Sequence, residues 1–144
     1  MDEDEFRKHR AAIPGPRCPF AKALLATCAA CQLAGRINLA ERELIICHES
    51  LAQQRCQQMH DLLRHNFGFA IGTLHDDAPL PHAQEMRIQC GGLRGLHDVL
   101  HGTPDVADAN SLMDDVLQRW PDPEALPYSA VVHAARLHYK GRHG

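Results

Sequence analysis

Cysteine thiols are the side chains of this sequence with the clearest capacity for chemistry. The chain has six cysteines in 144 residues, and all but one fall between positions 18 and 56. Thiolates are soft ligands, which favour zinc or an iron-sulfur cluster over ions that prefer oxygen. The clustering therefore predicts a metal site in the N-terminal half of the chain. The candidate ligands are Cys18, Cys28, Cys31, Cys47 and Cys56.

The stretch Cys28-Ala29-Ala30-Cys31 is the most specific feature of this group. In a helical turn or a tight loop, two thiols three residues apart can reach one point. We therefore expect Cys28, Cys31 and Cys47 to be ligands in every arrangement. The fourth ligand stays open: Cys18 joins if the C-x2-C segment opens into a loop, and Cys56 joins if the chain bends after Cys47.

Two further residues are weaker candidates for contact with the metal. His48 follows Cys47 at the expected bend, where it could replace a thiolate or donate a hydrogen bond to one. Cys90 precedes Gly91 and Gly92 in the middle of an expected helix, where the missing side chains would let a cofactor approach the backbone. Close helix packing around a buried cysteine explains the same pattern equally well.

The spacing of the ligands favours a [4Fe-4S] cluster over a single zinc ion. Compact zinc modules use two short ligand pairs, whereas this chain has one such pair. The remaining cysteines stand alone in the sequence, which suits separate elements that bring single ligands to a wide object. The predicted function is a small iron-sulfur protein in electron transfer or redox sensing, with a redox partner protein. The alternative is a structural zinc-binding helical interaction module without redox activity.

Other chemistries have less support in the sequence. Cys28 and Cys31 could act as a redox dithiol, but that use needs a preceding strand and a βαβ context, and helices are expected on both sides. The sequence has no serine nucleophile motif and no glycine-rich phosphate loop. We therefore expect an electron carrier, sensor or accessory protein rather than a catalyst.

Composition and charge bear on the compartment and the partners. The acidic start, Met1-Asp2-Glu3-Asp4-Glu5, does not resemble a secretory signal, so we expect a cytoplasmic protein, where structural disulfides are uncommon. The net charge is -3 and the basic residues are scattered, so nucleic acid is not an expected partner. No apolar run approaches the length of a membrane span, so no membrane is expected either.

These ligands must be positioned by the fold, which the sequence predicts to be all-α. Residues 1–17 should form a flexible polar arm, and residues 18–144 a single compact domain of five or six helices. Two capping-box patterns, at residues 38–41 and 50–53, mark helix starts. Residues 73–81 should form a surface loop. The expected helices cover residues 19–35, 41–47, 50–66, 82–100, 106–120 and 128–139.

Overall fold

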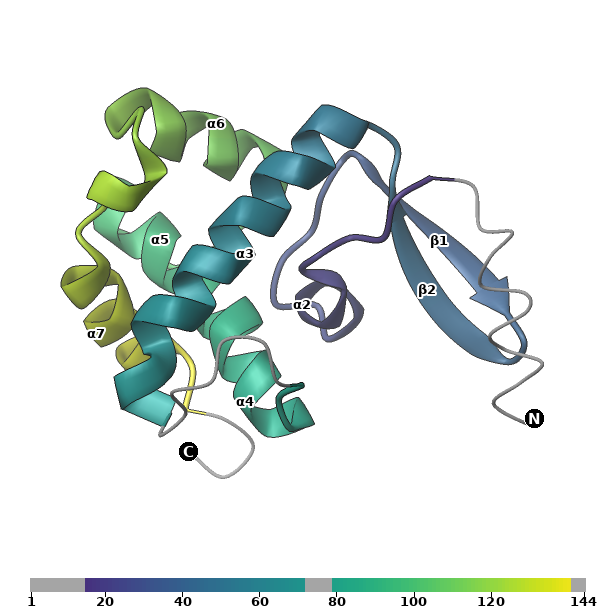
Figure 1. The fold of residues 1–144 in the computed structure, drawn as a ribbon, viewed down its shortest axis with the longest axis horizontal. Helices are drawn as coiled ribbons and strands as arrows, with labels where there is room; N and C mark the ends of the chain where they lie inside the picture. The colour runs from purple at the N-terminus through teal and green to yellow at the C-terminus, as the bar shows by residue number, and fades with distance from the viewer. Residues whose placement is uncertain (1–14, 72–78, 141–144) are drawn as a thin grey trace.

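The computed structural model describes residues 15–71 and 79–140 of the chain. Helices make up most of this part, and they form a compact domain with one β-hairpin (Figure 1). The prediction of a mostly helical domain is confirmed, and the hairpin corrects the prediction of an all-α fold. The α-helices are α2 (Ala21–Leu25), α3 (Ser50–Ile71), α4 (His82–Met86), α5 (Gly92–His101), α6 (Ala109–Arg119) and α7 (Tyr128–His138).

The hairpin occupies residues 34–47, where the sequence predicted the end of one helix and the whole of another. β1 (Ala34–Leu39) pairs in antiparallel fashion with β2 (Arg42–Cys47). Residues 44–46 of β2 are all buried, because α2 and α3 pack against the strand and the segment around Arg17 pairs with it. The predicted helix over 41–47 is therefore wrong: its apolar run is a strand that is covered on both faces.

The turn of the hairpin explains why the sequence misled us here. Ala40 and Glu41 both have positive φ, 54° and 69°, which matches the turn that suits a two-residue hairpin. Asn-Gly is the usual sequence of such a turn, because residues with a Cβ pay about 1 kcal/mol or more in this region. Without that signal, Asn38 to Glu41 matches a helix-capping box instead.

The predicted helix over 19–35 is also wrong beyond its first turns, since α2 ends at Leu25. Thr27 takes a left-handed conformation with φ 62°. The amide of Cys28 donates to the carbonyl of Ala23 over 2.9 Å, and the amide of Thr27 donates to the carbonyl of Leu24 over 3.1 Å. These two hydrogen bonds end the helix at a left-handed residue, a position that glycine usually occupies. The chain from Thr27 to Cys31 then opens into a loop, which is the condition under which the sequence predicted Cys18 to join the site.

α3 crosses the molecule diagonally in Figure 1 and joins the hairpin to the other helices. It runs past the predicted end near Asn66 and through Gly68 to Ile71. Met59, Leu63 and Phe67 repeat every four residues along it and are buried in the core. The helix that the sequence predicted from residue 50 is confirmed, although its predicted end is too early and Leu51, near its start, is exposed.

The helical segment around Cys90 continues through its glycine pair. A π-helical turn, η1 (Arg87–Gly91), joins α4 to α5 without a break. A side chain at Gly92 would place its Cβ 2.9 Å from the Cδ1 atom of Leu63 on α3, and one at Gly91 would lie 3.3 Å from the Cβ atom of Ala135 on α7. The two glycines therefore allow close helix packing, with Cys90 fully buried among the helices.

α6 and α7 confirm the two predicted C-terminal helices, with ends shifted by a few residues. Asp108 caps α6, because its carboxylate accepts the amide hydrogens of Asn110 and Ser111. A short 3-10 turn, η2 (Pro123–Ala125), lies between the two helices. α7 packs closely on α5, where a Cβ at Gly95 would lie only 2.5 Å from the carbonyl oxygen of Val131.

Two predicted segments lie wholly or partly outside the described residues. Residues 1–14 of the predicted arm and residues 73–78 of the predicted loop are among them. The described end of the arm packs against the sheet, since Arg17 bridges to Ile46. Within the described part of the chain, no helix combines the length and the apolar character that crossing a bilayer requires.

Candidate metal centre

Four cysteines with free thiols line one small cavity, at the place where β2 leads into α3. These four are Cys18, Cys31, Cys47 and Cys56. The cavity has a volume of about 20 Å³, and apolar side chains, among them Phe20, Ile46 and Ala52, form much of its wall. Each thiol comes from a different part of the fold. The fold thus brings together four residues that are well separated in the sequence.

Backbone pairing places Cys18 opposite Ile45 and therefore diagonally across from Cys47. The amide of Cys18 donates to the carbonyl of Ile45 over 2.9 Å, and the amide of Cys47 donates to the carbonyl of Pro16 over 2.8 Å. The segment before α2 is therefore tied to β2 at an isolated β-bridge between Arg17 and Ile46, which fixes the backbone of both cysteines. The Sγ atom of Cys47 donates a hydrogen bond to the carbonyl of Glu49 over 3.2 Å.

Cys31 lies in the loop between α2 and β1, and its neighbours on both sides are tied to the segment that leads into α6. This anchoring holds an otherwise irregular loop, so the Cys31 thiol has a defined position. The contacts are a β-bridge between Ala29 and Val106, a 2.8 Å hydrogen bond from the amide of Ala109 to the carbonyl of Ala30, and a 3.0 Å hydrogen bond from the amide of Gln32 to the carboxylate of Asp108.

The first turns of α3 position Cys56. Glu49 caps this helix, since its carboxylate accepts hydrogen bonds from the amides of Leu51 (3.3 Å) and Ala52 (2.9 Å). Cys56 follows Ala52 by one helical turn, so both side chains lie on the face that borders the cavity. The chain does turn between Cys47 and Cys56, as the sequence suggested, although it turns from a strand into a helix.

Burial favours the neutral form of three thiols, those of Cys18, Cys31 and Cys56. It raises the pKa of Cys18 from 9.0 to about 11 and that of Cys56 to about 12. The pKa of Cys31 is also raised, again mainly by burial. The charges of neighbouring cysteines add to the shift in all three cases, because a second thiolate in the cavity would repel the first. A bound cationic metal would reverse this balance and stabilise the thiolates.

Two polar residues near the cavity were missed in the sequence. The guanidinium charge of Arg55 partly offsets the rise in the pKa of Cys56. Arg55 is held by Asn110, whose side-chain oxygen accepts a 2.7 Å hydrogen bond from Nη2 and which itself borders the cavity. The position of Arg55 directly before Cys56 was the available signal, since cations favour thiolates. Nothing in the sequence pointed to Asn110, which approaches from α6.

The donor set can be compared with what a metal group requires. In the described residues, no group of three or more histidine, cysteine, aspartate or glutamate side chains is arranged to hold a metal ion as it stands. The four cysteines line the cavity together, although no three of them are placed to bind one ion as they stand. Four thiols in an apolar wall are the donor chemistry of a cysteine-bound cluster or a tetrathiolate ion. The chemistry of the residues therefore fits a soft metal.

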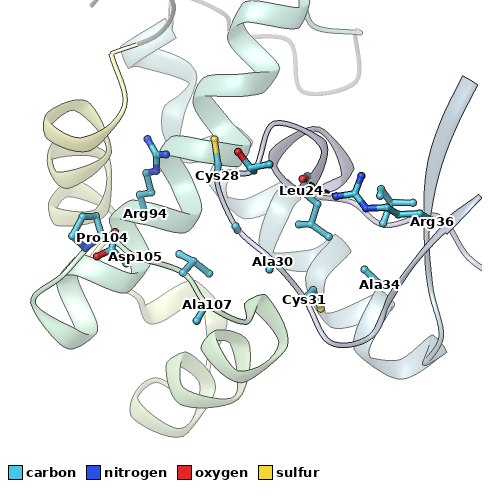
Figure 2. A pocket seen from close by; sticks show the side chains of 14 residues that line it. Leu24, Cys28, Ala30, Cys31, Ala34, Arg36, Arg94, Pro104, Asp105 and Ala107 are labelled. Carbon is cyan, nitrogen blue, oxygen red and sulfur yellow. Dashed lines mark hydrogen bonds between the residues drawn. The ribbon is translucent and has the colours of Figure 1, made fainter.

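Cys28 and Cys90 lie apart from this group. They form a disulfide whose Cα atoms are 5.6 Å apart, and Cys28 borders a second cavity, which Cys31 also lines. In Figure 2, the sulfur of Cys28 points toward the helix that carries Arg94, whereas the sulfur of Cys31 points to the opposite side of the loop. The predicted C-x2-C chelate is thus divided between two sites, and both alternatives for the outlying ligand, Cys18 and Cys56, lie in the four-thiol cavity.

His48 is placed against the hairpin. A Cβ added at Gly35 would lie 2.3 Å from the Nε2 atom of His48, so the imidazole ring rests on the backbone of β1. His48 does not border the four-thiol cavity, whereas its neighbour Cys47 does. The glycine at position 35 provides the room for the ring.

Comparison with known proteins gives no assignment. No protein-family model, no curated protein and no solved structure matches this chain.

Proposed function

We propose that this chain is a small iron-sulfur protein that acts in electron transfer or redox sensing. Its [4Fe-4S] cluster would be held by the four free cysteines, Cys18, Cys31, Cys47 and Cys56. The observation that carries the proposal is the shared cavity, which these cysteines reach from four separate parts of the fold. If these cysteines served only as small apolar residues of the core, nothing would require all four free thiols to line the same cavity.

The arrangement of the ligands favours a cluster over one ion. Each cysteine arrives alone from a different element, and no three of the described candidate ligands converge on one ion position. In a cube, each thiolate binds a different iron atom, so the sulfur atoms stand further apart than around a single ion. The cluster also spreads its charge over many atoms, which lowers the cost of placing it in an apolar cavity.

The residues of the chain would have distinct tasks at this site. The four thiolates would bind the iron atoms, and the guanidinium of Arg55 would offset part of their negative charge. The strand pairing of Cys18 and Cys47 and the anchored loop of Cys31 would hold the sulfur positions in both oxidation states. A rigid set of ligands lowers the reorganisation that electron transfer requires. When bound, the cluster supplies the exchange of one electron.

Electron transfer or sensing is favoured over a purely structural role by the core of the helices. Leu63, Leu93, Met113, Val116 and Val131 are almost completely buried in one core, and cysteines of the cavity lie at the edge of this core. A domain of this size can fold on such a core and has less need of a metal staple than a minidomain. A redox partner protein and a cytoplasmic location belong to this proposal.

The second candidate is a structural zinc site in a helical interaction module. The volume of the cavity favours it, because about 20 Å³ suits one ion and is smaller than a cube. The position of the cavity is also suitable, since its ligands connect the hairpin and the segment before α2 to the first turns of α3. In this case the metal would fix the hairpin to the helices and would have no redox role.

Anaerobic purification followed by a redox titration tests the proposal. The iron-sulfur protein should be brown, contain iron and acid-labile sulfide, and show a reversible one-electron couple within roughly -700 to +450 mV, the range of such clusters. A colourless protein with one bound zinc would move the assignment to the structural module. A protein that binds iron and sulfide but shows no reversible couple would refute the carrier and sensor roles.

A further inference from the structure

We propose that the Cys28–Cys90 disulfide is a thiol-exchange site that a dithiol reductant opens from the solvent, and that its oxidation state controls how firmly Cys31 is held. The disulfide joins positions 62 residues apart and links the loop after α2 to the turn before α5. The exchange reaction stands on its own, and the effect on Cys31 as a metal ligand rests on the proposed function.

The two sulfur atoms differ in their access to solvent. Cys28 is half-buried and borders a cavity of about 560 Å³ (Figure 2). Thr27, Ala30 and Ala107 also line this cavity and are exposed, so it opens to the solvent. Cys90 is fully buried in the core. The cavity therefore gives an incoming thiolate a route to Cys28, whereas Cys90 is closed to the solvent.

A fixed positive charge stands in the same cavity. Arg94 follows Cys90 by one helical turn and lines the cavity with Cys28 (Figure 2). Its Nη1 atom donates a 2.9 Å hydrogen bond to the carbonyl of His138, and its guanidinium lies 5.7 Å from the ring centre of Tyr139. These contacts hold the side chain in place. A guanidinium in this position favours the approach of an anionic thiolate.

The reaction consumes one dithiol and moves two electrons. The first thiolate of the reductant attacks Cys28, which forms a mixed disulfide and releases Cys90 as a thiolate that takes up a proton. The second thiol of the reductant then loses its proton and attacks the reductant's first sulfur atom, which is bonded to Cys28. Cys28 leaves as a thiolate and takes up a proton. The reductant leaves as a cyclic disulfide, and the protein gains two thiols.

The buried position of Cys90 explains why the reductant must be a dithiol and why the reduced protein is stable. Once released, Cys90 lies beside the mixed disulfide and attacks it again, so a monothiol is expelled before the reaction is complete. A dithiol completes the reaction because its second thiol is already attached. The protonated thiol of Cys90 is then a small apolar side chain in an apolar core, which suits that position.

The loop that contains Cys28 also carries the proposed ligand Cys31. The disulfide holds one end of this loop, and the contacts of Ala29, Ala30 and Gln32 with the segment before α6 hold the rest. Reduction removes the covalent anchor three residues from Cys31 and leaves only hydrogen bonds. Groups that orient a metal ligand typically change metal affinity by 10- to 100-fold. The reduced protein should therefore release its metal roughly ten times faster.

The exchange reaction is tested on the folded, full-length protein under argon. Samples are treated with dithiothreitol or with glutathione, quenched in acid, alkylated in denaturant and analysed by peptide mass spectrometry. We expect dithiothreitol to convert Cys28 and Cys90 into alkylated thiols without denaturant, and equimolar glutathione to leave the disulfide largely intact. A disulfide that resists dithiothreitol until the protein is unfolded, or a pair that diamide does not oxidise in the folded protein, would overturn the proposal.

The effect on the metal site is tested after the dithiol has been removed by gel filtration. The rate of metal transfer to a chromophoric chelator is measured for the oxidised protein, the reduced protein and the Cys28→Ser/Cys90→Ala double variant. Alanine replaces Cys90 because a buried serine hydroxyl would lack a partner. The double variant should match the reduced protein and should not respond to dithiothreitol.

Equal rates for the oxidised and reduced proteins would refute the control of Cys31, whatever the exchange assay shows. If the protein binds no metal at the four thiols, the proposed function fails while the alkylation result still decides the exchange reaction. Reduction should also lower the melting temperature by roughly 10 °C, because the disulfide closes a long loop. An unchanged melting temperature would contradict its role as the anchor of the loop.

Discussion

Metal uptake by the four-thiol cavity should release protons, and the affinity should rise steeply with pH. Cobalt(II) is the probe for the uptake of a single ion, because its tetrathiolate complexes absorb strongly; to bind it, the thiols would have to draw closer together than they stand. The pKa values of Cys18 and Cys56 are raised by burial to about 11 and about 12, and that of Cys31 is raised above 9.0. All three thiols are therefore protonated at neutral pH. Each must lose its proton before it can bind the metal.

The magnitude follows from this proton count. Between about pH 6.5 and pH 8, the logarithm of the apparent association constant should rise by about three or more for each pH unit, one for each thiol that ionises. Burial accounts for much of the cost: a pKa of about 12 in place of 9.0 adds roughly 4 kcal/mol to the ionisation of Cys56. The slope thus reports how many buried thiols become ligands.

Affinities are measured by competition with a chelator at several pH values, and proton release is measured separately with an indicator dye in weak buffer. Cys56→Ser should lower the slope by about one, because one ionising ligand is lost. Cys28→Ser/Cys90→Ala is the matched control, since both residues lie outside the cavity, and its slope should equal that of the parent protein. A slope near zero in the parent protein would refute the assignment of these thiols as buried, protonated ligands.

Three further predictions concern the packing of the helices, a buried histidine and the charge beside Cys56. Gly95→Ala should lower the free energy of unfolding in urea by about 2 kcal/mol, because the new Cβ would lie 2.5 Å from the carbonyl oxygen of Val131. His60→Gln should cost about 2 kcal/mol near pH 6 and less near pH 9. Burial opposes protonation of His60, but the hydrogen bonds and negative charges of Glu85 and Asp61 together outweigh burial and raise the pKa of His60. The stabilisation is therefore complete below pH 6.5 and fades as the pH rises through the higher value. Arg55→Gln should weaken cobalt(II) binding roughly tenfold, because the guanidinium no longer lowers the pKa of Cys56.

Each of these predictions has a result that would count against it. Ser129→Ala, at an exposed position of α7, is the control for Gly95→Ala and should change stability by less than about 0.5 kcal/mol; equal stability of the two variants would contradict the close approach of α5 and α7. A loss in His60→Gln that is the same at both pH values would show that protonation is not involved. Unchanged cobalt(II) affinity in Arg55→Gln would remove Arg55 from the site.

The sequence predicted the elements whose signals are local. The apolar repeat of Met59, Leu63 and Phe67 predicted α3, and the spans of α6 and α7 followed from their own periodicity. The hairpin had no such signal, because Ala40 and Glu41 occupy a turn that usually contains asparagine and glycine. The end of α2 was missed for the same reason, since Thr27 stands where glycine is usual.

The sequence predicted only part of the site. The clustering of the cysteines is visible in the sequence, but which cysteines come together in space is not. Spacing alone favoured Cys28 and Cys31 as a pair, but the loop turns their side chains in opposite directions. The partner of Cys28 is Cys90, 62 residues away, and only the packing of the helical turn η1 brings it near. The meeting of Cys18 with Cys47 likewise depends on strand pairing, which required the hairpin to be known.

The most direct test of the proposed site is the metal content of two single variants, Cys47→Ser and Cys28→Ser, purified anaerobically beside the parent protein. Bound iron, acid-labile sulfide and zinc are measured per chain, and circular dichroism checks that both variants are folded. If the four free thiols form the site, Cys47→Ser loses most of the metal that the parent binds, whereas Cys28→Ser retains it. Metal loss in Cys28→Ser with retention in Cys47→Ser would contradict the site.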